Sequence, residues 1–187
     1  METAQVVALV AFLLVAAGVT FGVRRTGSIL SRTREAESFR GEVHDLVRRA
    51  ELSLSEIAIL IDGVRRRAAE PETIGASLSA ARDAADRYAD EARTLSAPPM
   101  AVVHRDAIVH ELERAGRALE LVEHGCSLLG SGRRFERGPE ADTAVKRGYL
   151  NLIHAREAMA EHALRAIERA EDASPVRRIR RRPSSPP

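Results

Sequence analysis

The feature that most constrains the fold of this chain is an apolar repeat with alternating steps of four and three residues, which recurs in four segments. A helix with such a repeat presents one apolar seam along its length and buries that seam against a neighbouring helix. The segments cover about residues 35–69, 72–95, 100–129 and 140–172, and the repeat is loosest in the last. The seam positions are Val43, Leu46, Ala50, Leu54, Ile57, Ile61 and Val64; Ile74, Leu78, Ala81, Ala85, Tyr88, Ala92 and Leu95; Ile108, Leu112, Ala115, Leu119, Val122, Cys126 and Leu129; and Val145, Tyr149, Leu152, Met159, Ala163 and Ala166. Four helices with apolar seams predict an all-α bundle.

Prolines separate the four segments. Pro71, the pair Pro98 and Pro99, and Pro139 have no backbone N–H to donate, so each would disrupt a helix interior but suits a first helical turn. The short connections at Pro71 and Pro98 favour antiparallel neighbours, as in an up-down-up-down bundle. Aromatic residues make up only 3% of the chain and Trp is absent, which suits helices rather than strands. An extended coiled coil is the alternative architecture.

The N-terminal segment Ala4–Val23 reads AQVVALVAFLLVAAGVTFGV and contains no formal charge. A helix of this length spans the roughly 30 Å hydrocarbon core of a bilayer, so we predict a single transmembrane helix here. The alternative is a cleaved signal peptide, but such peptides have a basic n-region and an apolar core of about 7–15 residues. Residues 1–3 contain Glu2 and no Lys or Arg. The segment therefore favours a retained anchor, with residues 1–3 on the outer side.

The residues after the predicted span set its orientation. Because cytoplasmic flanks are enriched in basic residues, we expect the C-terminal side to be cytoplasmic and the membrane to be a prokaryotic inner (plasma) membrane. A basic juxtamembrane segment then covers 24–34 and a cytoplasmic bundle covers 35–172. The basic residues, with no acidic residue among them, are Arg24, Arg25, Arg32 and Arg34.

Two glycines lie within the predicted span. Gly18 and Gly22 form Gly-xxx-Gly, a spacing that lets a second helix approach closely and so suggests a homodimer contact. Glycine is also simply common in membrane helices, and that interpretation stays open.

The C-terminal residues 173–187 are predicted to be disordered. Ser174–Pro187 contains five arginines, four prolines, three serines and no acidic residue, so it cannot bury enough apolar surface to offset chain ordering. The arginines could contact anionic lipid headgroups, where each is worth about 1 kcal/mol. Nucleic acid is disfavoured because no aromatic residue interleaves them to stack on bases, and a solubilising tail without a defined partner stays open. These arginines are Arg177, Arg178, Arg180, Arg181 and Arg182.

The histidine and cysteine content does not form a metal or catalytic pattern. A di-iron bundle needs Glu-x-x-His on two helices, and here the pairs His110–Glu113 and His154–Glu157 run in the reverse order. The lone Cys126 cannot make an intramolecular disulfide, and no cysteine metal motif or Ser/His/Asp set with recognisable context occurs. We therefore expect no metal, no cofactor and no enzymatic activity.

One histidine suggests a separate hypothesis. The stretch His110–Arg114 reads HELER and superficially resembles the phosphoacceptor box of sensor histidine kinases. His110 falls between the seam residues Ile108 and Leu112, so its side chain is predicted to be at least partly exposed. The proline expected after that box is missing and no Gly-rich nucleotide-binding domain follows, so a surface histidine is the favoured interpretation.

Three functional hypotheses arise from these features. The leading one is a non-enzymatic, single-pass membrane scaffold or adaptor that binds a protein partner or a second copy of itself. The second is a signalling or phosphotransfer bundle centred on His110, and the third is a membrane tether for nucleic acid through the arginine tail. In an up-down bundle that begins at the membrane, the turn near Pro98 and the end near Asp172 return toward the bilayer. Residues 130–138 then point away from it.

Overall fold

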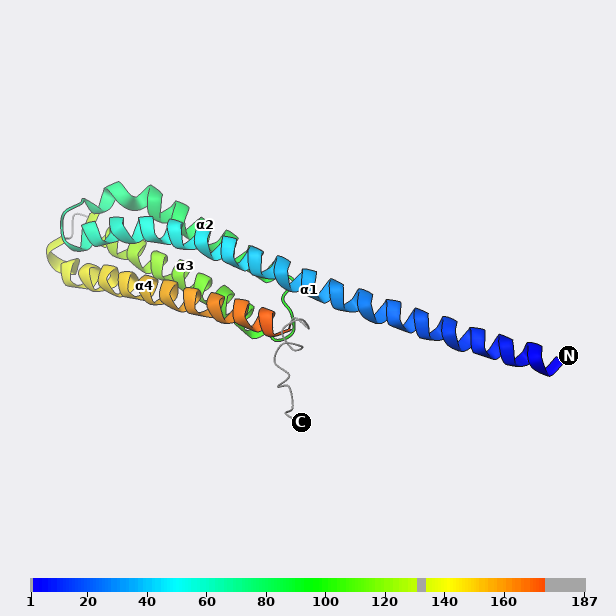
Figure 1. Ribbon diagram of the computed structural model, residues 1–187. Coiled ribbons are helices and arrows are strands. Elements are labelled where there is room, and N and C mark those ends of the chain that lie inside the picture. Colours follow the sequence, from blue (N-terminus) through cyan, green and yellow to red (C-terminus); the bar gives the residue numbers. More distant parts are fainter. Residues whose placement is uncertain (1, 131–133, 174–187) are drawn as a thin grey trace, which may run out of the picture.

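The described part of the chain is all-helical, and its helices pack together as the apolar seams predict. The computed structural model describes residues 2–130 and 134–173, and the side chains of residues 31, 33–130 and 138–172. The elements in chain order are the helix α1, the single-turn 3₁₀ helix η1, and the helices α2, α3 and α4 (Figure 1). Their bounds are Glu2–Arg65, Pro71–Ile74, Gly75–Thr94, Val102–Gly130 and Arg134–Ala173.

The four helices form an antiparallel bundle rather than an extended coiled coil (Figure 1). Among neighbouring α-helices, the most extensive pairing joins α3 to α4, and the least extensive joins α1 to α2. The N-terminal part of α1 continues past the ends of the other helices (Figure 1). Where α1 leaves the bundle, Arg40 forms an ion pair of 2.8 Å with Glu171 near the end of α4. We call this end of the bundle the proximal end.

The connection between α2 and α3 also lies at the proximal end. It lines a hollow of about 980 Å³ together with Glu35 and Ala36 of α1, and Pro98 and Pro99 lie in its wall. The turn near Pro98 and the end of α4 therefore both return to the point where α1 leaves the bundle, as the up-down order predicts.

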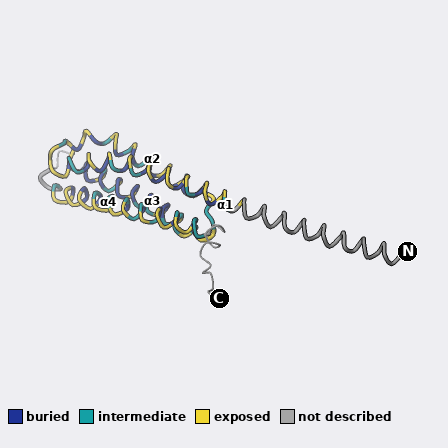
Figure 2. Tube along the Cα trace, in the orientation of Figure 1, coloured by how far each residue is buried: buried dark blue, intermediate teal, exposed yellow. Residues whose placement is uncertain are grey.

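The predicted seams form the core. All seven seam residues of α1 are buried, and of the other three seams only Tyr88, Leu129 and Tyr149 are half-buried (Figure 2). The buried residues divide into two clusters, one at the proximal end around Phe39 and Leu46 and one at the opposite, distal end. No charged or polar side chain is buried among the residues whose side chains are described. Burial of aliphatic side chains on every helix therefore holds the bundle together.

Helices α3 and α4 approach each other closely at a pair of glycines. A Cβ atom built on Gly148 of α4 would lie 2.7 Å from the carbonyl oxygen of Ala118 on α3, and one built on Gly125 of α3 would lie 3.0 Å from that of Ala141 on α4. Each glycine thus faces the backbone of the other helix. This contact explains why α3 and α4 form the most extensive pairing, since small residues let two helix backbones come together.

The expected helix break at Pro139 was wrong. Helix α4 begins at Arg134, so Pro139 lies inside it, and the connection before α4 is shorter than 130–138. Pro139 has no N–H to donate to the carbonyl of residue 135, so α4 loses one backbone hydrogen bond near its N-terminus. The Pro139 carbonyl itself accepts a hydrogen bond of 2.7 Å from Thr143 Oγ1.

The end of α1 is fixed by backbone hydrogen bonds. Arg67 N–H donates to the Val64 carbonyl over 2.9 Å and Ala68 N–H donates to the Gly63 carbonyl over 2.8 Å. These two bonds form a Schellman motif, in which Arg67 takes the left-handed conformation with φ 59°. Pro71 then begins η1, where its missing N–H costs nothing.

Helix α1 runs without interruption through three segments that differ in sequence character, 4–23, 24–34 and the first bundle helix. The side chains of the predicted span Ala4–Val23 lie outside the described residues. Within the part of the chain that is described, no helical stretch combines the length and the apolar character that a membrane crossing requires.

Candidate functional site

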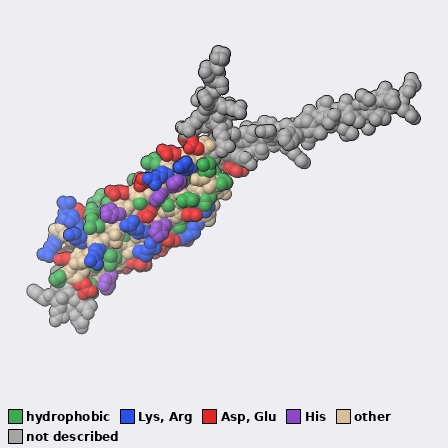
Figure 3. All heavy atoms as spheres, turned by 90° about the horizontal axis from the view of Figure 1, so that it is seen from below, with side chains coloured by type: hydrophobic (Ala, Val, Ile, Leu, Met, Phe, Trp, Pro, Cys, Tyr) green, Lys and Arg blue, Asp and Glu red, His purple; other side chains and the backbone are tan. Residues whose placement is uncertain are grey.

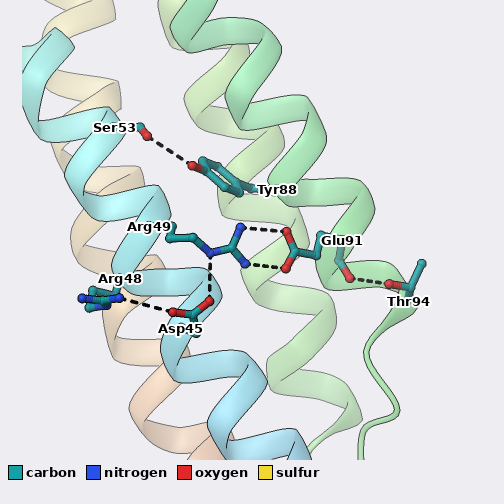
Figure 4. Close-up of polar contacts among 7 residues, drawn as sticks. All are labelled: Asp45, Arg48, Arg49, Ser53, Tyr88, Glu91 and Thr94. Atoms are coloured by element: carbon teal, nitrogen blue, oxygen red, sulfur yellow. Dashed lines mark hydrogen bonds and ion pairs between the residues drawn. The ribbon is translucent and has the colours of Figure 1, made fainter.

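A polar cluster joins α1 to α2 in the proximal half of the bundle (Figure 4). The Arg49 guanidinium of α1 donates to both carboxylate oxygens of Glu91 on α2, over 2.5 and 3.2 Å, and its Nε donates to Asp45 over 3.0 Å. The same guanidinium lies 5.5 Å from the centre of the Tyr88 ring. The Tyr88 hydroxyl in turn lies 3.2 Å from the Ser53 hydroxyl.

Electrostatics in this cluster favour the charged forms. Hydrogen bonds from Arg48 and Arg49 hold the pKa of Asp45 below its ordinary value, and Glu91 holds the pKa of Arg49 above its ordinary value. Asp45 and Arg49 are therefore held in their charged forms. The bidentate pair of Arg49 with Glu91 orients α1 against α2.

A shallow groove between α1 and α2 begins where this cluster ends. It encloses about 290 Å³ and is lined by Ser53, Glu56 and Leu60 of α1 and by Ser77, Ala80 and Ala84 of α2. The α2 wall is made of small side chains, of which Ser77 and Ala80 are exposed. The α1 wall continues onto the outer face of that helix with two large apolar side chains, Leu52 and Ile59, which are 59% and 69% exposed. We call this surface the α1–α2 face.

A pair of histidines lies between α3 and α4 near the proximal end. The rings of His104 on α3 and His162 on α4 have centroids 6.0 Å apart, and the Nδ1 atom of each is buried without a hydrogen-bond partner. Burial first, and then the charges of His162, Arg165 and Arg169, hold the pKa of His104 below its ordinary value of 6.5. Figure 3 shows histidine and basic side chains close together on one face of the bundle.

Protonation of His104 opposes the folded state. In the neutral ring Nδ1 can remain a bare acceptor, whereas the imidazolium must place an N–H donor at this buried atom, which has no acceptor. It would also add a positive charge beside those of Arg165 and Arg169. The two histidines form no larger ligand set, because the described residues contain no group of three or more His, Cys, Asp or Glu side chains placed to hold a metal ion.

Acid should therefore destabilise the bundle through His104. Because the folded-state pKa lies below the unfolded value of about 6.5, the unfolded chain binds more protons in this range, and stability falls as the pH falls from about 6.5 toward the folded-state pKa. Denaturant unfolding at pH 7.5 and pH 5.5 measures the loss. His104→Gln should reduce it, whereas His110→Gln, at an exposed position of the same helix, should not. Equal losses in the two variants would contradict this assignment.

Two of the other predicted site residues, His110 and Arg34, have described side chains. The side chain of His110 is exposed on α3, as expected, and the neighbouring Glu111 pairs with Arg114 over 3.3 Å. Arg34 is exposed on α1. The remaining candidates lie outside the residues whose side chains are described: Gly18, Gly22, Arg24, Arg25, Arg32, Arg177, Arg178, Arg180, Arg181 and Arg182. Of the described candidates, neither His110 nor Arg34 lines the α1–α2 groove or belongs to the histidine pair.

The single cysteine is not a reactive group. Cys126 is buried, and burial, followed by the charges of Glu72 and Glu123, raises the pKa of its thiol to about 11. Because the thiolate is the nucleophile and metal ligand, a thiol held in its protonated form performs neither role.

Comparisons of this chain with protein-family models, with curated proteins and with solved structures found no match. A functional proposal therefore depends on the sequence and on the geometry described above.

Proposed function

We propose that this protein is a non-enzymatic, single-pass membrane adaptor of a prokaryotic inner membrane, whose cytoplasmic bundle is held at a fixed distance from the bilayer. The observation that carries the proposal is the continuity of α1 from Glu2 to Arg65. One helix contains both the uncharged stretch Ala4–Val23 and a complete bundle seam. A span and a bundle that share a helix cannot rotate freely about each other.

The part of α1 between Val23 and the bundle sets the distance of the bundle from the bilayer. Among the described side chains of α1, Ala36 is the first that is buried, and it follows Val23 by 13 positions. At 1.5 Å per residue the bundle would begin about 20 Å from the edge of the hydrocarbon core. The headgroup region occupies only part of this distance, since it adds about 5–8 Å on each side. Arg24 and Arg25 would lie at the headgroups, and the bundle would present its faces to partners in the cytoplasm.

The non-enzymatic part of the proposal is supported by the pairing of charged groups. Arg49, Arg82 and Arg93 form ion pairs with carboxylates of other helices, which uses these charges to connect the bundle. Three exposed apolar side chains, Leu52, Ile59 and Leu60, lie close together in the sequence of α1. Exposed apolar residues next to one another are typical of surfaces that bind other proteins.

Membrane fractionation tests the anchor. Replacing both Leu13 and Leu14 by arginine should release the full chain from carbonate-washed membranes, because each arginine at the centre of a span costs about 2.5–3.5 kcal/mol of insertion free energy. Leu164→Arg, at a position 65% exposed on α4, is the matched control and should remain in the membrane. Equal retention of the Leu13/Leu14 variant and the wild type would overturn the anchor.

Crosslinking in native membranes tests the adaptor role, and crosslinking that returned only monomer would oppose that role.

The exposure of His110 favours a second candidate function, a phosphotransfer module. An exposed imidazole on one helix of a bundle is accessible to a phosphodonor protein. Incubation with labelled phosphodonors decides between the adaptor and the phosphotransfer module. Label that is absent, or unchanged in His110→Ala, removes the phosphotransfer module.

The tether for nucleic acid remains a prediction from the arginine tail alone. Deletion of 174–187 followed by a salt-dependent DNA retention assay tests it.

A further inference from the structure

We propose that the α1–α2 face binds a second copy of this chain across a twofold axis parallel to α1. The direction of the axis rests on the proposed function, because two chains anchored in one membrane must lie parallel. The two helices of this face differ in the size of their exposed side chains. Helix α1 contributes the large exposed side chains Leu52, Ile59 and Leu60, whereas α2 contributes Ser77 and Ala80.

A parallel twofold axis brings these unlike surfaces together. Rotation by 180° about an axis that runs along the face places α1 of each copy opposite α2 of the other. The ridge of large side chains on one copy then meets the strip of small side chains on its partner, and the same contact is made twice. This self-complementarity is what an isologous interface requires.

The heights of the residues also match. Rotation about an axis parallel to the helices leaves the height of every residue along the bundle unchanged. Leu60 of α1 and both Ser77 and Ala80 of α2 line the same small groove, so they lie at similar heights. Leu60 of each copy would therefore meet the small side chains of its partner without any sliding of one bundle along the other. An antiparallel axis would instead place α1 against α1.

Charge complementarity supports the same arrangement. Glu56 on α1 and Arg87 on α2 are exposed, and neither forms an ion pair with another described residue. The 3.2 Å contact between Ser53 and Tyr88 and the ion pair between Arg49 and Glu91 place each of these pairs at similar heights along the two helices. Glu56 lies three residues distal to Ser53, and Arg87 lies one residue distal to Tyr88, so their Cα atoms differ in height by about 3 Å. Across the proposed axis each carboxylate would face a guanidinium of the partner.

The weak internal pairing of α1 with α2 is consistent with this interface. Among the neighbouring helix pairs of the bundle, this pair has the least extensive contact, and the groove lies between its members. A second copy seated on the face would cover the groove and the exposed leucine and isoleucine side chains together.

Charge reversal tests the proposal on the full chain in detergent micelles, with light scattering as the measure of oligomeric state. Glu56→Arg should raise the dimer dissociation constant at least about tenfold, because it places two pairs of like charges across the axis. Arg87→Glu should do the same, and the double variant should recover most of the wild-type affinity. Leu164→Glu on α4 is the control and should leave the dimer unchanged. All of these positions are exposed, and circular dichroism checks that the variants fold.

A wild-type chain that is monomeric would overturn the proposal. A dimer that neither single charge reversal weakens would also overturn it, because that dimer would be held by another surface such as the Gly18–Gly22 segment. Recovery in the double variant is the result that a nonspecific loss of stability cannot produce. A dimer would be detected whether or not the chain is retained in membranes, so failure of the interface and failure of the anchor are separate results.

Crosslinking tests the direction of the axis. A chain carrying Leu60→Cys, mixed with a chain carrying Ala80→Cys, should form a mixed disulfide on oxidation, because these residues face each other only in the parallel arrangement. The buried Cys126 should not compete. Leu164→Cys mixed with Ala80→Cys should give none. Failure of the Leu60–Ala80 pair to crosslink in a chain that is dimeric would exclude the parallel axis.

Discussion

Replacing Gly148 by alanine should lower the free energy of unfolding by about 1–3 kcal/mol, although alanine is the better helix former. The added Cβ would lie 2.5 Å from Val122 Cγ2 and 2.7 Å from the Ala118 carbonyl oxygen. Real Cβ atoms do not come this close to other atoms, so α3 and α4 would have to move apart. Since the carbonyl belongs to the backbone, a change of side-chain rotamer cannot relieve the contact.

Gly41→Ala provides the matched control for this substitution. Gly41 lies in the interior of α1, and a Cβ built there has nothing within 4 Å. The same exchange should therefore stabilise the protein by about 0.5–1 kcal/mol through the lower backbone entropy of the unfolded chain. Denaturant unfolding of both variants separates the contact from the helix propensity. A Gly148→Ala variant as stable as Gly41→Ala would show that α3 and α4 do not approach this closely.

The contact between Gly148 and α3, and the equivalent contact between Gly125 and α4, correspond to a spacing that α3 and α4 share. This spacing can be recognised as a contact only once the structure is known. Ala118, Val122 and Gly125 on α3 have the same spacing as Ala141, Val145 and Gly148 on α4, and each glycine faces the alanine and valine of the other helix. The apolar seams already identified Val122 and Val145 as core positions. The register between two antiparallel helices cannot be obtained from either seam alone, so the pairing of the glycines required the structure.

Features that belong to a single helix could be predicted from the sequence, whereas features that depend on the packing of two helices could not. The seams predicted the largest buried side chains of the four helices except Phe39, because a periodicity of three and four residues is a property of a single helix. The histidine pair could not be predicted, because His104 and His162 are 58 positions apart and meet only when α3 and α4 are packed. The start of α4 was missed because a proline was treated as a helix boundary, whereas a proline near the N-terminus is tolerated.

The second large effect is expected at Phe39, which lies one step beyond the predicted seam of α1. Phe39 and Ala36 continue the repeat of α1 back from Val43 by steps of four and three, and both are buried. Phe39 is 1% exposed and belongs to the same buried cluster as Ala166 and Ala170 of α4. It is therefore the large core side chain nearest to the point where α1 leaves the bundle.

Phe39→Ala should lower the free energy of unfolding by about 3–5 kcal/mol, because it removes a fully buried ring and leaves a cavity that the alanine-rich surroundings fill poorly. Leu164→Ala, at a position of α4 that is 65% exposed and lies outside the α1–α2 face, should cost less than about 1 kcal/mol. Denaturant unfolding measures both values. Hydrogen exchange should in addition show that the loss of protection in Phe39→Ala begins at the proximal end of α1 and α4, since Phe39 joins these two elements there.

The stability of Phe39→Ala also bears on the proposed function. The fixed distance between membrane and bundle requires α1 to be packed firmly at the point where it leaves the bundle, and Phe39 is the side chain that meets this requirement. If Phe39→Ala cost no more than Leu164→Ala, the first turns of α1 in the bundle would not be held by the core. The span and the bundle would then move independently, and an adaptor that depends on a rigid connection would be excluded even if the anchor itself were retained.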